Sequence, residues 1–287
     1  MQRKRIKRVG LFVKSKSERA LRTRVVLENF LKTQNIKYFV AVSNKKIKKM
    51  DLAIVLGGDG TLLSVVSKLE FQIPILGINL GDFGFMTELN VSELFPTLKD
   101  ILRGKYCVDN RILLEVEVRD TTKSTSKKYN VLNEVAVHNK WTSRMVSLET
   151  YIDREYVMTV QGDGLIVATP TGSTAYSLAA GGPIVTPTTN SITLTPICPH
   201  TLTHRPLIIP NSSHIEIRLP SKKQNIMATF DGQQNQVLSQ HHVLYIRKSK
   251  RIVSLIKSPL RTYFDILRTK LYLGYRGSKK NKRVLKN

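Results

Sequence analysis

The run Gly57-Gly58-Asp59-Gly60-Thr61 constrains the fold of this chain more than any other feature, because it separates two apolar stretches. Residues 52–56 before it are short and continuously apolar, which is typical of a strand buried on both faces of a sheet. Residues 61–69 after it have the pattern of a helix. The sequence therefore predicts a buried strand, a tight turn and a helix, as found in α/β folds.

The first 104 residues repeat this alternation of strands and helices. Predicted strands cover residues 9–13, 38–42, 52–56 and 73–78, and predicted helices cover residues 17–33, 61–69 and 92–102, the last with Ser92 as its N-cap. This pattern indicates a mostly parallel sheet with helices on both faces. Ligands of such sheets bind beyond the carboxyl ends of the strands, which is where the glycine run falls.

After Gly104 the pattern changes to an alternation of apolar and polar residues. Residues 113–119, 148–153, 215–219 and 243–247 show this period of two, which is typical of half-buried antiparallel strands. We therefore expect three parts. They are an α/β domain over residues 1–104, a predominantly β domain over residues 105–262, and a C-terminal helix with a basic tail over residues 263–287 that packs back on the first domain.

Composition is typical of a globular cytoplasmic protein. The 287 residues are 41% hydrophobic and 23% charged, and no apolar run approaches the roughly 20 residues needed to span a bilayer. Cys107 and Cys198 lie far apart, which fits reduced thiols, and neither the cysteines nor the six histidines have the spacing of a metal site. We expect a cytoplasmic protein with no membrane segment and no metal bound by the chain itself.

The formal net charge of +25 raises the hypothesis of a nucleic-acid-binding protein. The excess of lysine and arginine lies mostly at residues 3–8, 45–49 and 279–286, and no RNP-like segment with interleaved aromatic residues accompanies it. A solvated surface, or a basic surface that attracts nucleotides, explains the charge more simply. Nucleic acid is therefore not the expected partner.

The glycine run suits a site for phosphate. Glycines let backbone N–H groups approach phosphate oxygens without a Cβ in the way, and a helix N-terminus favours anions. Gly57, Gly58, Gly60 and Thr61 are the candidate phosphate-loop residues, and Asp59 would position or deprotonate a hydroxyl that accepts a phosphoryl group. A plain tight turn is the alternative, because Gly and Asp dominate turns for conformational reasons.

Two further segments place polar residues where a ligand would explain them. Residues 79–85 form a second glycine-rich turn at the same edge of the predicted sheet. Asn133 and Glu134 lie inside the apolar run 131–137, where an unpaired polar group is costly. A structural network, or a ligand that carries adjacent hydroxyls, would satisfy this pair.

Residues 162–183 combine a predicted strand, 165–168, with a long loop rich in glycine and hydroxyl groups and a short helix near Ser173. Small residues allow a planar or ribose-bearing ligand to approach closely, and Tyr176 offers a stacking face. The same composition also permits a structural turn. Residues 231–233, Asp-Gly-Gln, are predicted to form a turn, and a purely local role is one alternative for its two polar side chains.

Together these segments resemble the NAD kinase family, whose motifs occur here in order across residues 9–260. The resemblance includes residues 199–202, Pro-His-Thr-Leu, and Arg205-Pro206. The run at residues 57–61 is shared with diacylglycerol and sphingosine lipid kinases and is echoed in phosphofructokinases, so it indicates only that superfamily. The block at residues 169–177 is much more specific to NAD kinases.

The resemblance implies a Rossmann-like α/β N-terminal domain of the phosphofructokinase and lipid-kinase type, a β-rich C-terminal domain and a site between them. The implied reaction transfers the γ-phosphoryl group of ATP, or of polyphosphate in some members, to the 2′-hydroxyl of the adenosine ribose of NAD, giving NADP. It also implies Mg²⁺ that arrives with ATP, and a homodimer or homotetramer. A lipid kinase, a nucleic-acid-binding protein and a nucleotide sensor without turnover are the alternatives.

By its position in the family motifs, Asp59 would be the proton acceptor. The residues that the resemblance implies in binding NAD are Asp59, Gly60, Asn133, Glu134, Arg144, Asp163, Thr174, Ala175, Tyr176, Ser177, Leu178, Ala179 and Gln233.

Overall fold

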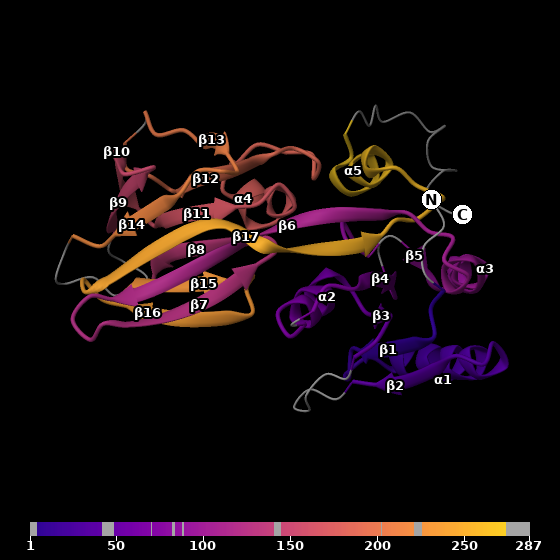
Figure 1. The fold of residues 1–287 in the computed structure, drawn as a ribbon. Helices are drawn as coiled ribbons and strands as arrows, with labels where there is room; N and C mark the ends of the chain where they lie inside the picture. The colour runs from indigo at the N-terminus through magenta and orange to yellow at the C-terminus, as the bar shows by residue number, and fades with distance from the viewer. Residues whose placement is uncertain are drawn as a thin grey trace. The chain divides into compact units, whose positions relative to one another are not determined.

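The computed structural model describes residues 5–41, 49–69, 71–81, 84–87, 89–140, 145–201, 203–220 and 226–273. The chain divides into two compact units, one made of Met1–Leu62, Ile75–Val108 and Ile256–Asn287 and the other of Leu63–Pro74 and Asp109–Leu255. We call them the first and the second unit, and Figure 1 labels their elements. Among the described helices, none is long and apolar enough to cross a membrane.

The described strands of the first unit form a parallel array. They pair in the order β2 (Lys37–Val40), β1 (Arg8–Val13), β3 (Leu52–Leu56), β4 (Pro74–Asn79) and β5 (Leu89–Asn90). Every residue of β3 is buried, which explains why its sequence is continuously apolar. The glycine run follows β3 at its carboxyl end, as the sequence predicts.

Three helices of the first unit begin with a side-chain cap: α1 (Glu18–Thr33), α3 (Val91–Leu102) and α5 (Tyr263–Leu271). In α3 the Oδ1 atom of Asn90 accepts a hydrogen bond from the backbone N–H of Glu93 at 3.0 Å. The Glu93 carboxylate in turn accepts one from the backbone N–H of Asn90 at 3.1 Å. The predicted N-cap, Ser92, is wrong because this capping box starts the helix before Ser92.

The helix that follows the glycine run, α2 (Asp59–Val66), begins at Asp59 and not at residue 61 as predicted. The backbone N–H groups of Thr61 and Leu62 donate to the carbonyl oxygen of Gly58 at 3.0 and 3.2 Å. Helical hydrogen bonding therefore begins inside the glycine run. Asp59 occupies the first turn of α2, where the helix dipole favours a carboxylate.

The strands of the second unit form two sets. One set pairs in the order β10 (Glu155–Gly162), β9 (Val146–Ile152), β14 (Ile215–Arg218), β17 (His242–Ile256), β6 (Val108–Asp120) and β7 (Thr125–Val131). The other set is antiparallel and pairs in the order β13 (Leu207–Pro210), β12 (Ser191–Ile197), β11 (Gly164–Ala168), β8 (Glu134–Asn139), β15 (Ile226–Phe230) and β16 (Gln234–Leu238).

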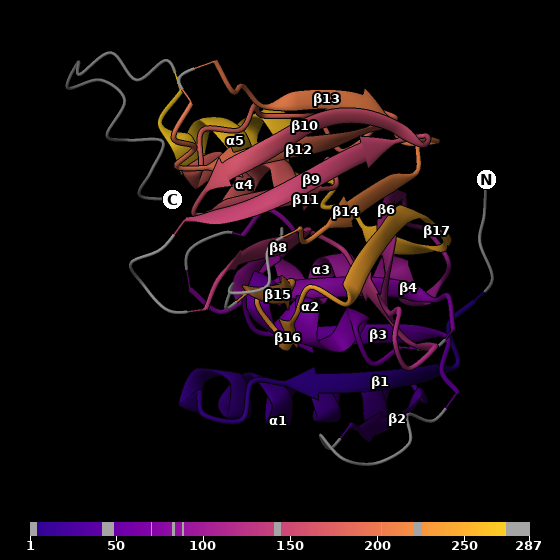
Figure 2. The same ribbon diagram turned by 90° about the vertical axis from the view of Figure 1, so that its left-hand side faces the viewer.

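The core of the second unit lies between these two sets. Val116, Leu148 and Ile217 of the first set share one buried cluster with Val135 and Leu194 of the second. The sets therefore pack face to face as a β-sandwich, whose strands can be followed in Figure 2. The predicted combination of an α/β part and a predominantly β part is confirmed.

Candidate functional site

The side chain of Asp59 is held by the loop that follows β4. Its Oδ2 atom accepts a hydrogen bond from the backbone N–H of Phe85 at 2.8 Å. Its Oδ1 atom accepts from the backbone N–H groups of Met86 and Thr87 at 3.2 Å each and from the Thr87 hydroxyl at 3.0 Å. Since a carboxylate offers about two acceptor positions per oxygen, Oδ1 is filled and Oδ2 keeps room for a further donor.

The glycines around Asp59 fall into two classes. A Cβ on Gly84 would lie 2.0 Å from Oδ1 of Asp59, and a Cβ on Gly57 would lie 2.4 Å from Oγ1 of Thr61. At Gly58 and Gly60, by contrast, an added Cβ would meet no described atom within 4 Å. The fold itself needs glycine at 57 and 84, whereas the backbone at 58 and 60 is open to a phosphate group.

Two buried polar residues hold the Asp59 carboxylate in place, Thr87 by direct hydrogen bonds and Asn79 through Thr87. Nδ2 of Asn79 donates to Oγ1 of Thr87 at 3.0 Å, and Oδ1 of Asn79 accepts from the backbone N–H of Gly81 at 2.8 Å. Thr87 is 0% exposed. Sequence reasoning includes Asn79 in the second glycine-rich turn but misses Thr87, which lies two residues beyond that segment and carries no signal of its own.

In the second unit, Asp231 organises the turn that leads into β8. Its carboxylate accepts hydrogen bonds from the backbone N–H groups of Leu132 and Asn133 at 2.7 Å each and of Glu134 at 3.1 Å. The alternative of a purely local role is therefore wrong for Asp231, because its partners lie 97 to 99 residues earlier in the chain. The pairing of β15 with β8 brings these distant segments together.

Asn133 and Glu134 are each 7% exposed. Within the described part of the chain, Oδ1 of Asn133 and Oε2 of Glu134 have no hydrogen-bond partner. Buried polar atoms of this kind are costly, so these two atoms are the best candidates in the second unit for binding polar groups of a ligand.

Glu134 and Asp231 share this buried turn but differ in protonation. Burial, and then the nearby charge of Asp231, raise the pKa of Glu134 to about 8. Burial also raises the pKa of Asp231 to about 6, although three backbone N–H donors act in the opposite direction. Glu134 therefore keeps its proton at neutral pH, while Asp231 carries the negative charge that the N–H groups stabilise.

The hydroxyl-rich loop after β11 is tied directly to this turn. The backbone N–H of Thr169 donates to the carbonyl oxygen of Asn133 at 2.8 Å, and the Thr169 hydroxyl donates to the carbonyl oxygen of Leu132 at 2.5 Å. The loop then forms a short 3₁₀-helix (Gly172–Thr174) and the helix α4 (Tyr176–Ala179). The structure thus brings Asn133, Glu134 and the predicted loop together.

Within this loop the buried hydroxyls bind the protein itself. The Ser173 hydroxyl donates to the carbonyl oxygen of Pro170 at 2.7 Å, and the Ser177 hydroxyl pairs with that of Thr195 at 2.9 Å. Tyr176 is 44% exposed, so its ring is free to stack on a ligand. Among the other predicted contact residues of this loop, Ala179 is exposed, and Thr174, Ala175 and Leu178 are half-buried.

Asp163 and Gln233, both exposed, lie at opposite ends of β8. Gln233 follows Asp231 in the turn beside Glu134, whereas Gly164 pairs with His138 near the other end of the strand. The rise of five strand residues separates these ends by about 17 Å, so a ligand that contacts both must be extended. Arg144 lies outside the described residues.

Sequence reasoning also misses Arg111, a buried cation beside the loop. Arg111 is 2% exposed; its guanidinium forms an ion pair with Asp109 at 2.9 Å and donates to the Thr171 hydroxyl at 3.3 Å. In the strand sequence 108–120 this arginine has no apparent signal, because its partner in the loop, Thr171, lies 60 residues away in the chain. Arg111 therefore supports the loop from inside the protein.

Replacing Gly172 with alanine is expected to destabilise the second unit. An added Cβ would lie 2.1 Å from the backbone carbonyl oxygen of Asn133, which cannot move aside as a flexible side chain could. We expect the free energy of unfolding to fall by about 1 to 3 kcal/mol, measured in urea. Gly58→Ala is the matched control, since its Cβ meets open space. Equal stability of the two variants would contradict the tight loop packing.

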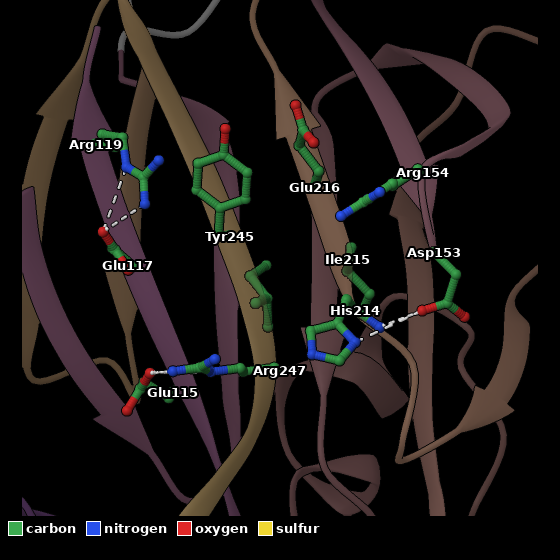
Figure 3. Close-up of a pocket in the computed structure, with 11 residues that line it drawn as sticks. Glu115, Glu117, Arg119, Asp153, Arg154, His214, Ile215, Glu216, Tyr245 and Arg247 are labelled. Atoms are coloured by element: carbon green, nitrogen blue, oxygen red, sulfur yellow. Dashed lines mark hydrogen bonds and ion pairs between the residues drawn. The ribbon is translucent and has the colours of Figure 1, made fainter.

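A groove of about 490 Å³ on the second unit is a separate feature (Figure 3). Its charged side chains largely pair with one another: Arg119 with Glu117 at 3.1 Å and Arg247 with Glu115 at 2.7 Å. Nδ1 of His214 lies 3.7 Å from the Asp153 carboxylate. The described residues that line it include none of those predicted to bind a ligand. Because the charges are largely neutralised, we do not assign the candidate site to this groove.

Each unit, taken by itself, presents groups that suit phosphoryl transfer. The first unit joins a glycine-rich helix start, suited to phosphate, with a fixed carboxylate that can accept a proton or orient a hydroxyl. The second unit presents an unpartnered amide oxygen and a neutral carboxyl group, suited to the polar groups of an uncharged acceptor.

Comparisons with known proteins specify the family. The model of the ATP-NAD kinase N-terminal domain matches residues 9–106, and that of the C-terminal domain matches residues 132–258. The NAD kinase of Desulfatibacillum aliphaticivorans is 41% identical over 279 residues, which cover 93% of this chain and 98% of the relative. The NAD kinase of Syntrophotalea carbinolica is 44% identical over 228 residues, 79% of this chain and 80% of the relative.

Solved structures agree with this assignment. Yeast NADH kinase complexed with NADH superposes with a TM-score of 0.88 at 25% identity, over 96% of this chain and 90% of that one. An NAD kinase from Archaeoglobus fulgidus in complex with ATP superposes with a TM-score of 0.74 at 24% identity, over 92% and 98% of the two chains, and shows the shared fold. This chain belongs to the NAD kinase family, which confirms the resemblance stated from the sequence.

Proposed function

We propose that this enzyme transfers the γ-phosphoryl group of ATP to the 2′-hydroxyl of the adenosine ribose of NAD, giving NADP and ADP. The observation that carries the proposal is the carboxylate of Asp59, which is fixed at the start of α2 and keeps acceptor capacity at Oδ2. The family supports the choice of substrates, since one solved relative was complexed with NADH and another with ATP.

In the proposed step, the 2′-oxygen bonds to the γ-phosphorus while the bond from that phosphorus to the β–γ bridging oxygen breaks. ADP leaves with that electron pair, and the hydroxyl proton passes to Asp59. Because the transition state of phosphoryl transfer is loose, the hydroxyl loses its proton late, and Asp59 acts mainly by orienting it. The backbone of the phosphate loop, Gly57, Gly58, Gly60 and Thr61, would bind the phosphates of ATP.

The second unit would bind the dinucleotide. The unpartnered amide oxygen of Asn133 is able to accept a hydrogen bond, and the neutral carboxyl group of Glu134 is able to donate and to accept, which suits the adjacent hydroxyls of a ribose. Tyr176 would stack on a planar ring. The further contacts that we propose are Gly60, Arg144, Asp163, Thr174, Ala175, Ser177, Leu178, Ala179 and Gln233.

A divalent cation, Mg²⁺, would enter with ATP as part of that substrate. Within the described residues, no three His, Cys, Asp or Glu side chains come together as a metal site. When bound to ATP, the ion would neutralise charge on the phosphates.

We also propose that the chain forms a homodimer or homotetramer and works in the cytoplasm. Family membership supports both, and the two exposed free thiols, Cys107 and Cys198, suit a reducing compartment. Light scattering of the purified protein would test the oligomeric state.

Polyphosphate as an alternative donor stays a prediction, tested by replacing ATP with polyphosphate in the activity assay.

The direct test of the proposed activity is incubation of the protein with ATP, Mg²⁺ and NAD, with NADP read out by an NADP-specific dehydrogenase. We expect NADP to accumulate when all three are present and not when ATP is omitted. Absence of NADP from a preparation with a cooperative melting transition would contradict the proposal.

A further inference from the structure

We propose that Thr87, held in place by Asn79, is a positioning residue that turns the Asp59 carboxylate so that Oδ2 receives the substrate hydroxyl. The inference rests on the proposed role of Asp59 in the reaction and extends it to two buried residues of the first unit. It identifies which carboxylate oxygen of Asp59 receives the substrate hydroxyl and which residues hold the carboxylate in that orientation.

The direction of the Thr87 hydroxyl hydrogen follows from its two partners. Nδ2 of Asn79 can only donate, and it lies 3.0 Å from Oγ1 of Thr87. The orientation of that amide is set by the backbone N–H of Gly81, which donates to Oδ1 of Asn79 at 2.8 Å. The Thr87 hydroxyl must therefore accept from Asn79 and donate to Oδ1 of Asp59, 3.0 Å away.

Oδ1 of Asp59 is thereby closed to a substrate. It already accepts from the Thr87 hydroxyl and from two backbone N–H groups, and a Cβ on Gly84 would lie only 2.0 Å from it. Oδ2 accepts a single hydrogen bond, from the backbone N–H of Phe85, among the described residues. Oδ2 is therefore the oxygen that can still accept a hydrogen bond from a substrate. The hydrogen bond from the Thr87 hydroxyl to Oδ1 determines that this free oxygen is Oδ2.

The surroundings of Thr87 allow shape and hydrogen bonding to be separated. Thr87 is 0% exposed, and its methyl group packs on the backbone of Gly77, where an added Cβ would lie 2.8 Å from Cγ2 of Thr87. Valine keeps this methyl contact and the volume but lacks the hydroxyl. Serine keeps the hydroxyl but lacks the methyl group.

The expected results follow from this pair of variants. Loss of a hydrogen bond to a charged group is expected to lower kcat of Thr87→Val about 10- to 100-fold, with KM for NAD changed less than about threefold. Thr87→Ser should recover most of the lost kcat. Asn79→Asp, which replaces the donor by an acceptor of the same shape and draws the Thr87 hydrogen away from Asp59, should resemble Thr87→Val.

The decisive measurement is a double-mutant cycle. If Thr87 acts through Asp59, adding Thr87→Val to Asp59→Asn should lower kcat by less than about threefold. The inference would be overturned if Thr87→Val lowered kcat equally in the wild type and in Asp59→Asn, or if Thr87→Val kept the wild-type kcat. Either result leaves the proposed function intact as long as the wild-type enzyme forms NADP. Should Thr87→Val fail to melt cooperatively, Asn79→Asp replaces it in the same cycle with the same two outcomes.

Discussion

Replacing Asp59 with asparagine is expected to lower kcat about 10²- to 10⁴-fold, equivalent to about 3 to 5.5 kcal/mol of barrier, with a modest change in the affinity for NAD. The physical reason is that asparagine cannot accept the proton of the 2′-hydroxyl and presents an N–H₂ group where a carboxylate oxygen now accepts. Steady-state kinetics with NADP detection give kcat, and isothermal titration gives the affinity.

A control is needed because Asp59 also holds its loop. An amide nitrogen in place of Oδ2 would face the backbone N–H of Phe85, which costs one hydrogen bond and some stability. Asp51→Asn is the matched control, since Oδ2 of Asp51 accepts from the backbone N–H groups of Lys7 and Arg8 at 3.0 and 2.9 Å. Unchanged turnover in Asp59→Asn would remove Asp59 from the reaction, and an equal loss in Asp51→Asn would indicate a stability effect.

The second large effect concerns pH and stability. The pKa of Glu134 is raised by burial and by Asp231 from its ordinary value of 4.5 to about 8. Between these values the native protein keeps the Glu134 proton while the unfolded chain loses it, so the native state is penalised as pH rises. The stabilising effect is present below pH 4.5 and is lost as pH rises toward 8, with a slope of up to about 1.4 kcal/mol per pH unit.

The variant Glu134→Gln tests whether Glu134 makes the free energy of unfolding fall as pH rises. The variant carries no titratable group at 134, so its free energy of unfolding should fall less steeply between pH 5 and pH 8 than that of the wild type, by about 1.4 kcal/mol per pH unit. Urea denaturation at several pH values measures the slopes. Glu155→Gln, at an exposed position, is the control and should keep the wild-type slope. Parallel curves for Glu134→Gln and the wild type would show that Glu134 is ionised in the native protein.

The main elements of the fold were predictable because their own residues carry the signal. The buried strand β3 is apolar throughout, and α1 starts after Ser17, whose side chain accepts from the backbone N–H of Ala20. Strands such as β7 and β16 escaped prediction because few of their residues are buried, and they are held by pairing with β6 and β15. Such edge strands depend on a partner that a local pattern does not reveal.

The candidate site divides in the same way. Three site residues could be identified from the sequence. Asp59 is a carboxylate within a glycine-rich turn, and Asn133 and Glu134 are polar residues within an apolar run. The roles of Thr87 and Asp231 were not predictable, because each contacts a segment far away in the chain. The partner of Thr87 lies 28 residues away, and those of Asp231 lie 97 to 99 residues away. Side chains that hold other groups in place are identified by tertiary contacts, which a single sequence does not display.

The position of the adenosine ribose in a crystal structure with bound NAD is the measurement closest to the central claim. Our account predicts that the 2′-oxygen lies at hydrogen-bond distance, about 2.6 to 3.2 Å, from Oδ2 of Asp59, while Asn133 and Glu134 contact the same dinucleotide. A well-defined NAD molecule whose 2′-oxygen binds elsewhere, with Asp59 still bonded only to its own loop, would contradict it.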